Sequence, residues 1–348
     1  MPTTYAIPDG RTVMAATLYT GNGTGQSISN DVNGVSFQPD FTWFKRRDAV
    51  TAHALANSVS GIKNVMASNL TDAEYTESAL NGLISYDSDG FTVGTVGGFT
   101  AFNASGSSIV AWNWKAGGTA VTNTAGSITS QVSASPTAGF SVVTYTGNAT
   151  IGATIGHGLG VAPSMVIVKR RDGVAIGWVV GHTSIGWTNQ LELNSTIAST
   201  AYNGFNSTTP TSSVITTNNS GSINGSGFNY VAYCYAAVPG YSAFGSYTGN
   251  GSSNGPFVYL GFRPRFVMFK RTNSTGSWFM EDTSRGTFNV MGPELYANSS
   301  DSEGPVSRLD VLSNGFKMRA ANAGDNASGG SYIYMAFAEN PFKYANAR

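Results

Sequence analysis

Charged residues are scarce in this chain of 348 residues, where Lys, Arg, Asp and Glu together make up 11% against a usual ~25%. Nineteen basic residues balance nineteen acidic ones, so the formal net charge is zero. A general nucleic-acid binder carries a basic excess, and electrostatic attachment to an anionic membrane needs one too. The composition therefore predicts neither a nucleic-acid partner nor a membrane partner.

Cysteine is almost absent as well. Cys234 is the single cysteine, so no disulfide can form within the chain, and its apolar neighbours predict a small buried side chain. The three histidines, His53, His157 and His182, are not spaced like zinc ligands, and no cysteine pair exists. We therefore expect no metal site and no cofactor.

Long apolar runs and helix signals are also missing. No run approaches the ~18–20 residues of a transmembrane helix, and the N-terminus lacks the basic and apolar regions of a signal peptide. We therefore expect the chain to be made and folded in a cytosol. The best helix candidate is residues 72–80, with acidic residues in its first turn and Gly82 after it.

What the chain has instead is an internal repeat, whose clearest member is a short apolar run between a proline and a basic cluster. This run occurs at residues 39–48, 163–172 and 264–273. Its β-branched and aromatic residues predict a buried strand, which we call the spine strand.

Four further markers recur in the same order around each spine strand. A Tyr-Thr-Gly-Asn turn precedes it, and a ring residue with a glycine eight positions later follows it. An asparagine-led apolar step comes next, and an aromatic strand closes the unit. The turns begin at Tyr19, Tyr145 and Tyr247, the ring residues are His53, Trp178 and Trp278, the asparagine-led steps are 64–67, 189–194 and 289–292, and the closing strands are 109–114, 230–235 and 332–337.

The repeat spacing, about 125 and then about 102 residues, gives each copy enough chain for a core of its own. We predict three domains, copy one (1–118), copy two (119–238) and copy three (239–348). Copy two begins with a Thr/Ser/Ala-rich linker that ends near Pro136, whereas Val238-Pro239-Gly240 is a short connection that predicts tighter coupling of copies two and three. The predicted fold class is all-β, with three tandem antiparallel β-sandwich (jelly-roll-like) domains and very little helix; closed barrels are the alternative.

The basic clusters at the ends of the spine strands are the candidate surface-contact residues. They could grip an acidic glycan or the acidic rim of a partner. They could equally be solvated strand ends whose charge discourages pairing at the sheet edge, and we favour this second interpretation. The residues concerned are Lys45, Arg46, Arg47, Lys169, Arg170, Arg171, Lys270 and Arg271.

The sequence contains no recognisable catalytic constellation, and we expect no enzymatic activity. The glycine-rich stretches 21–25 and 158–160 predict hairpin turns rather than phosphate loops, and residues 87–90 lack the rest of a calcium loop. A glycosidase needs two carboxyl groups ~5–10 Å apart, and the sequence places no two candidates together. These candidates are Glu192, Glu281, Asp282, Asp301, Glu303 and Asp310, while the tryptophans, which we expect to serve packing rather than sugar stacking, are Trp112, Trp114, Trp178, Trp187 and Trp278.

The repeat resembles a unit of structural proteins in the virions of tailed bacteriophages, notably marine ones. The resemblance is carried by residues 41–48, 71–74, 88–91, 110–118 and 334–342. It covers much of copies one and three, whereas copy two departs from it at 206–219. The resemblance implies a β-rich fold and a virion location after synthesis in a bacterial host, and it provides no catalytic residues to transfer.

We therefore expect a virion protein, with a tail or fibre-like appendage used in assembly and host-surface contact as the first hypothesis. Its expected partners are other virion proteins and a host-surface glycan, and closed symmetry favours a homo-oligomer, with a trimer first. A capsid decoration or cement protein is one alternative. A glycan-degrading tail spike is the other.

Overall fold

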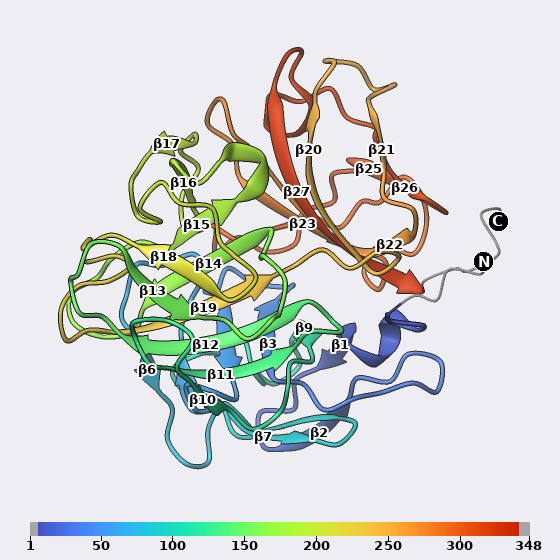
Figure 1. Ribbon diagram of the computed structural model, residues 1–348. Helices are drawn as coiled ribbons and strands as arrows, with labels where there is room; N and C mark the ends of the chain where they lie inside the picture. The colour runs from blue at the N-terminus through green and yellow to red at the C-terminus, as the bar shows by residue number, and fades with distance from the viewer. Residues whose placement is uncertain (1–5, 341–348) are drawn as a thin grey trace.

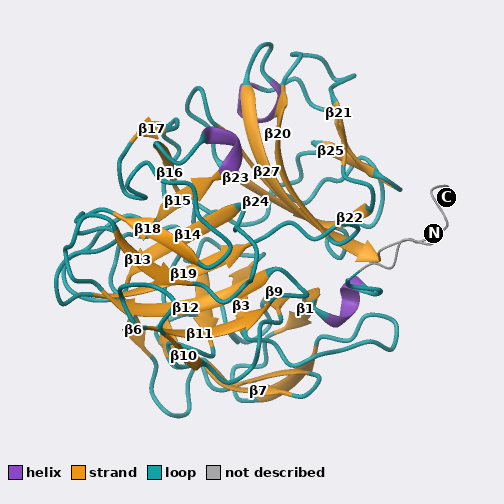
Figure 2. Cartoon of the chain, viewed as in Figure 1, coloured by secondary structure: helices purple, strands orange, loops and turns teal. Residues whose placement is uncertain are grey.

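The structure is a computed structural model that describes residues 6–340, and its regular secondary structure is almost entirely antiparallel sheet (Figure 1). Figure 2 shows how little helix there is: within the described residues the only α-helix is α1 (Ala323–Asn326), beside two 3-10 turns, η1 (Gly10–Thr12) and η2 (Thr183–Ile185). No helix in this part of the chain is long and apolar enough to cross a membrane. Residues 341 and 342, which belong to the phage resemblance, lie outside the described residues.

The helix predicted at residues 72–80 is wrong. This segment contains the short strand β6 (Tyr75–Thr76), paired with β5 (Asn64–Val65). Further along it, the buried Glu77 carboxylate accepts the backbone N–H groups of Gly98 and Phe99. Tertiary contacts of this kind override a short helix signal, because an isolated turn of helix contributes little stability.

Each copy contains a main sheet in which four strands keep one order. The opening strand, which ends at the Tyr-Thr-Gly-Asn turn, comes first. The closing strand, the spine strand and the strand at the ring residue, called the ring strand, follow it. The spine strand lies between two partners and is buried, which confirms the prediction. In this order the strands are β1 (Met14–Thr20), β9 (Ser108–Trp114), β3 (Phe41–Arg46) and β4 (Ala54–Asn57) in copy one, β12 (Phe140–Thr146), β19 (Asn229–Tyr235), β14 (Met165–Arg170) and β15 (Val179–His182) in copy two, and β20 (Ser242–Thr248), β27 (Ser331–Asn340), β22 (Arg263–Arg271) and β23 (Trp278–Asp282) in copy three.

A smaller antiparallel sheet accompanies each main sheet. In copies one and two, buried apolar side chains of the two sheets form a common cluster, such as Phe44 of β3 with Phe91 of β8 and Val166 of β14 with Ile155 of β13. The smaller sheets are β2 (Gln26–Ser29), β8 (Gly90–Val93) and β7 (Leu83–Asp87) in copy one, β13 (Ala153–Gly156) and β18 (Val214–Thr217) in copy two, and β21 (Phe257–Tyr259), β26 (Gly315–Met318) and β25 (Leu309–Leu312) in copy three.

The segment predicted as a linker, residues 119–136, is part of the main sheet of copy two instead. It forms β10 (Val121–Asn123) and β11 (Ser130–Ser135), and β11 pairs with β12 along its full length. Ser130, Val132 and Ser133 are buried, and Val132 belongs to the apolar cluster of copy two, so this serine-rich strand is anchored by a few buried residues. The same sheet ends at its far side with β16 (Asn189–Glu192) and β17 (Thr200–Ala201), and β24 (Leu295–Tyr296) occupies the corresponding edge in copy three.

The three copies share a core, in addition to the apolar clusters that copies one and two have of their own. One apolar cluster contains residues of all three main sheets. At its centre lie Trp114, Tyr235 and Phe337, one from the closing strand of each copy. Each of them pairs across the sheet with a spine-strand residue, the one four positions before the lysine of that strand. Their ring centroids are 6.5, 5.8 and 6.1 Å apart. Equivalent residues of three copies therefore meet at one point, which we call the aromatic hub.

Candidate functional site

The basic clusters lie between the copies rather than on the outer surface. Lys45, Lys169 and Lys270 are completely buried, so the assumption of exposed lysines, common to both interpretations of these clusters, is wrong. The sequence could not reveal this, because each ammonium group donates to at least one carbonyl of another copy, in addition to acceptors in its own copy. The bonds run from Lys45 Nζ to Ser300 O at 3.1 Å, from Lys169 Nζ to Thr71 O at 3.2 Å, and from Lys270 Nζ to Thr196 O at 3.1 Å.

Burial lowers the pKa of each of these three lysines to about 8. They therefore remain protonated at neutral pH. A buried ammonium group is tolerated only where hydrogen-bond acceptors replace its water shell, and backbone carbonyl groups do so here. Each lysine thus holds a neighbouring copy at a fixed position.

The ring residues form a second contact between copies. A side-chain nitrogen of each ring residue donates a hydrogen bond to a backbone carbonyl group of another copy. The three carbonyl groups, of Tyr296, Ala67 and Glu192, occupy equivalent positions in their own copies. In His53 the proton is on Nε2, because Nδ1 accepts a hydrogen bond from Trp43 Nε1 at 2.8 Å. The bonds are His53 Nε2 to Tyr296 O at 3.0 Å, Trp178 Nε1 to Ala67 O at 2.9 Å, and Trp278 Nε1 to Glu192 O at 2.9 Å.

Two backbone hydrogen bonds complete each contact. We call these contacts joint 1–3, joint 2–1 and joint 3–2. In each name the first number is the copy that donates the lysine and ring-residue hydrogen bonds, and the second is the copy that accepts them. Because each copy donates to one neighbour and accepts from the other, the three joints close a ring. The pairs are Thr51 N to Ser300 O with Glu303 N to Arg47 O, Ile176 N to Thr71 O with Glu74 N to Arg171 O, and Gly276 N to Thr196 O with Ser199 N to Thr272 O, all between 2.7 and 2.9 Å.

An asparagine organises the accepting segment of each joint. Its side-chain oxygen accepts the backbone N–H of the ring residue: Asn69 from His53, Asn194 from Trp178 and Asn298 from Trp278. The asparagine follows the ring residue by 16 residues in copy one, 16 in copy two and 20 in copy three. Copy three thus has four additional residues, and for this reason the sequence alignment of residues 289–292 with the other two asparagine-led steps is wrong.

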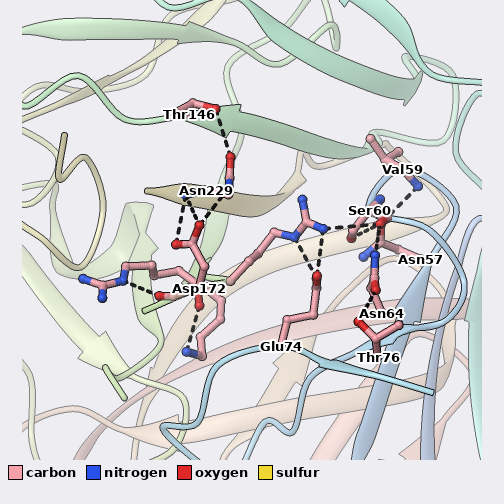
Figure 3. Close-up of polar contacts among 12 residues, drawn as sticks. Asn57, Val59, Ser60, Asn64, Glu74, Thr76, Thr146, Asp172 and Asn229 are labelled. Atoms are coloured by element: carbon pink, nitrogen blue, oxygen red, sulfur yellow. Dashed lines mark hydrogen bonds and ion pairs between the residues drawn. The ribbon is translucent and has the colours of Figure 1, made fainter. Parts of the chain in front are cut away.

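Arginines add ion pairs to two of the three joints. Arg47 binds Glu303 at joint 1–3, and Arg171 binds Glu74 at joint 2–1, both at 2.7 Å. Figure 3 shows Glu74 and Ser60 at joint 2–1, where the Ser60 carbonyl also accepts from Arg171. At joint 3–2 the equivalent positions are occupied by uncharged residues, Thr272 and Ser199.

The other arginines of the basic clusters also have partners within the chain. Arg46 pairs with Asp48 at 3.2 Å. Arg170 is buried, with its guanidinium carbon 3.7 Å from the centre of the Phe228 ring. Arg271 donates to the carbonyl of Ala323. Only Arg46, Arg47, Arg171 and Arg271 remain partly accessible, so any surface contact through these clusters must use them.

The carboxylates considered for glycoside hydrolysis include two interior groups. Glu281 is completely buried, neither of its oxygens has a hydrogen-bond partner in the described chain, and burial raises its pKa well above the ordinary value. Asp282 binds the buried Arg285 and accepts from Trp112 Nε1 at 2.9 Å. Neither group faces an open cleft.

The remaining chemical candidates are interior as well. All five tryptophans under consideration are buried, which confirms the prediction that they serve packing. Cys234 is buried too, and burial raises the pKa of its thiol to about 12. In residues 6–340 no group of three or more His, Cys, Asp or Glu side chains could hold a metal ion.

A pocket of about 530 Å³ lies beside joint 2–1 in copy one. Its walls include Leu70, Asp72, Tyr75, Phe99 and Thr100. Tyr75 is 48% exposed, and its ring centroid is 6.0 Å from that of Phe99. The sequence did not indicate this site, because Tyr75 lies in the segment predicted as helix and Phe99 lies in a loop more than 20 residues later.

Comparison with known proteins gives one match. No curated protein and no solved structure matches the chain. Residues 9–341 match a domain of unknown function, DUF7483. A single match thus spans all three copies, in keeping with their shared core, and the chain belongs to the DUF7483 family.

Proposed function

We propose that this protein is a non-enzymatic structural component of a bacteriophage virion, in a tail or fibre-like appendage. The observation that carries the proposal is the closed ring of three equivalent joints around one core. Each copy is held by both neighbours, which makes the whole chain a rigid block. The resemblance of copies one and three to phage structural proteins supports the virion location in this proposal.

The block consists, in this proposal, of three tandem jelly-roll-like β-sandwich domains with the boundaries 1–118, 119–238 and 239–348. Two observations support this division. The named strand ladders join strands of one copy only, and in copies one and two buried side chains fill the space between a main and a smaller sheet. Rigid sandwiches present loops at their ends, where binding residues commonly lie.

The partners in this proposal are other virion proteins and a glycan of the host surface. Zero net charge favours association. The predicted homotrimer stays a prediction, and the ring constrains it: the equivalent joint surfaces are already used within one chain, so a trimer would have to form through other surfaces.

Immunogold labelling of purified particles with antibodies against the protein tests the proposal. We expect gold at the tail. Absence of the protein from washed particles would refute a virion role, and the same particles labelled for a known shell protein provide the control.

A capsid decoration protein is the second candidate, and the aromatic hub favours it specifically. Three equivalent copies around one point match the threefold positions of an icosahedral shell. Head labelling in the same experiment would select this alternative and exclude the appendage.

A further inference from the structure

The three copies differ at one position that the joints do not explain. Six residues after the recurring asparagine, copy one has Tyr75, copy two has Thr200 and copy three has Gly304. β6 and β17 pair in the same way around this position, and Gly304 forms an antiparallel bridge with Glu294. Copies two and three build their joints without an aromatic side chain at this position. The fold therefore does not require the aromatic side chain of Tyr75.

Copy one nevertheless holds this ring in place. A Cβ atom on Gly98 would lie 2.6 Å from a Tyr75 ring carbon, so only glycine lets the backbone approach the ring so closely. Glu77, which is 3% exposed, fixes the same loop by accepting from Gly98 N at 3.1 Å and Phe99 N at 2.9 Å. The rings of Tyr75 and Phe99 are therefore positioned before any ligand arrives, which reduces the entropy cost of binding.

The walls of the pocket combine an apolar side with a polar rim. Leu70, Ala73 and the two rings supply the apolar side, and the Asp72 carboxylate and the Thr100 hydroxyl supply the rim. The volume of about 530 Å³ falls in the ~300–1,000 Å³ range of small-molecule sites. Glu74 is neutralised by Arg171, and the exposed Asp72 is attracted by the nearby charge of Lys169.

We infer that this pocket binds a neutral sugar ring, one hexose unit of a surface glycan. The apolar C–H face of a hexose fits against Tyr75 and Phe99, and its hydroxyl groups reach the polar rim. The described residues that line the pocket include no Lys or Arg side chain that could pair with the carboxylate of an acidic sugar. The inference deepens the host-surface contact proposed above and depends on that proposal for its biological role.

The test uses the full chain and a panel of methyl glycosides, observed by saturation-transfer NMR and titration calorimetry. The panel contains the methyl glycosides of glucose, galactose, mannose, rhamnose and N-acetylglucosamine, and methyl glucuronide as the acidic member. We expect at least one neutral member to bind at millimolar concentration and the glucuronide not to bind. Tyr75→Thr, which introduces the residue of copy two, should weaken binding about tenfold, whereas Tyr259→Thr, at a 68% exposed position of copy three, should leave it unchanged.

Failure of every neutral glycoside to bind at millimolar concentration would overturn the inference, as would unchanged binding by Tyr75→Thr. If Tyr75→Thr fails to fold by circular dichroism, Phe99→Leu is the replacement variant with the same expectation. Sugar binding by a protein absent from particles would refute the virion role and leave the pocket intact. Tail labelling without sugar binding would refute the sugar site alone.

Discussion

Joints 2–1 and 3–2 make the same ammonium, ring and backbone hydrogen bonds, yet only joint 2–1 contains an ion pair between copies. Arg171 and Glu74 face each other there, whereas Thr272 and Ser199 occupy these positions at joint 3–2. The hydrogen bonds alone therefore set the geometry of a joint. The ion pair is an addition whose Coulomb gain is offset in part by the desolvation of both groups.

The covalent connections between the copies differ, and so do the ion pairs of their joints. Copies two and three are joined by the short Val238-Pro239-Gly240 segment, and their joint has no ion pair among the described residues. Copies one and three are far apart in sequence, and there Glu303 binds both Arg47 and Arg285. Joint 2–1 has an ion pair, although the connection between copies one and two is also short, with only residues 115–120 between β9 and β10. Connection length alone therefore does not decide which joints contain an ion pair.

Loss of a ring residue should have the largest effect on both joints. We expect Trp178→Ala and Trp278→Ala each to lower the free energy of unfolding by about 3–5 kcal/mol, the usual cost of deleting a buried tryptophan. Urea denaturation followed by circular dichroism measures this, with Tyr259→Ala as the exposed control. A loss at only one of the two joints would contradict their equivalence.

Acid should affect joint 1–3 differently from the other two, because its ring residue is His53. Burial lowers the pKa of His53 from 6.5 to about 3, so the neutral form is favoured in the folded state. Its contribution to the free energy of unfolding is complete above pH 6.5 and is lost as pH falls towards 3. Between pH 7 and pH 5 the loss should be about 2 kcal/mol.

The variant His53→Gln keeps a donor and an acceptor but does not titrate. Its free energy of unfolding should therefore decrease by about 2 kcal/mol less than that of the wild type between pH 7 and pH 5, as measured by urea denaturation at both values. The pKa of His182 is also lowered by burial, to about 4, so some acid sensitivity should persist. Identical losses in the two proteins would refute the assignment.

Conversion of joint 2–1 into the form of joint 3–2 should have a moderate effect. Glu74→Ser alone leaves Arg171 without its carboxylate and should cost about 2 kcal/mol, whereas Glu74→Ser with Arg171→Thr should cost about 1 kcal/mol. A double-mutant cycle in urea measures the coupling between the two side chains. Additive losses would show that the pair contributes nothing beyond its separate residues.

The reverse conversion should have the smallest effect. Thr272→Arg with Ser199→Glu adds an ion pair to joint 3–2 and should raise the free energy of unfolding by about 0.5–1 kcal/mol at low salt. The gain should diminish in about 1 M salt, because screening weakens partly exposed pairs. A decrease in stability at low salt would mean that joint 3–2 has no room for the pair.

The repeat and its spine strands could be predicted from sequence, because β-branched and aromatic runs report local burial. The position of the lysines could not. A lysine after an apolar run usually marks a solvated strand end, and only the neighbouring copy reveals the carbonyl groups of Thr71, Thr196 and Ser300 that accept from it. The role of Asn298 was hidden by four additional residues in copy three, since alignment by spacing assumes equal loop lengths.

The pocket in copy one was hidden for a related reason. Its two rings come from segments more than 20 residues apart, and Tyr75 differs from its counterparts Thr200 and Gly304. The features that the three copies share therefore do not include this site. Once strand pairing aligns the three positions, the same differences indicate where copy one departs from the other two.

The closed ring makes the starting point of the chain arbitrary. η1 packs against β27, and a Cβ atom on Gly10 would lie 2.9 Å from Ala338 O, so the first and last described segments are adjacent. A circular permutant that ran from copy two through copy three to copy one, with a short peptide bridging the old ends, would retain every joint. New ends between copies two and three would remove the Val238-Pro239-Gly240 connection, and the refolding of that permutant would separate what the joints supply from what chain continuity supplies.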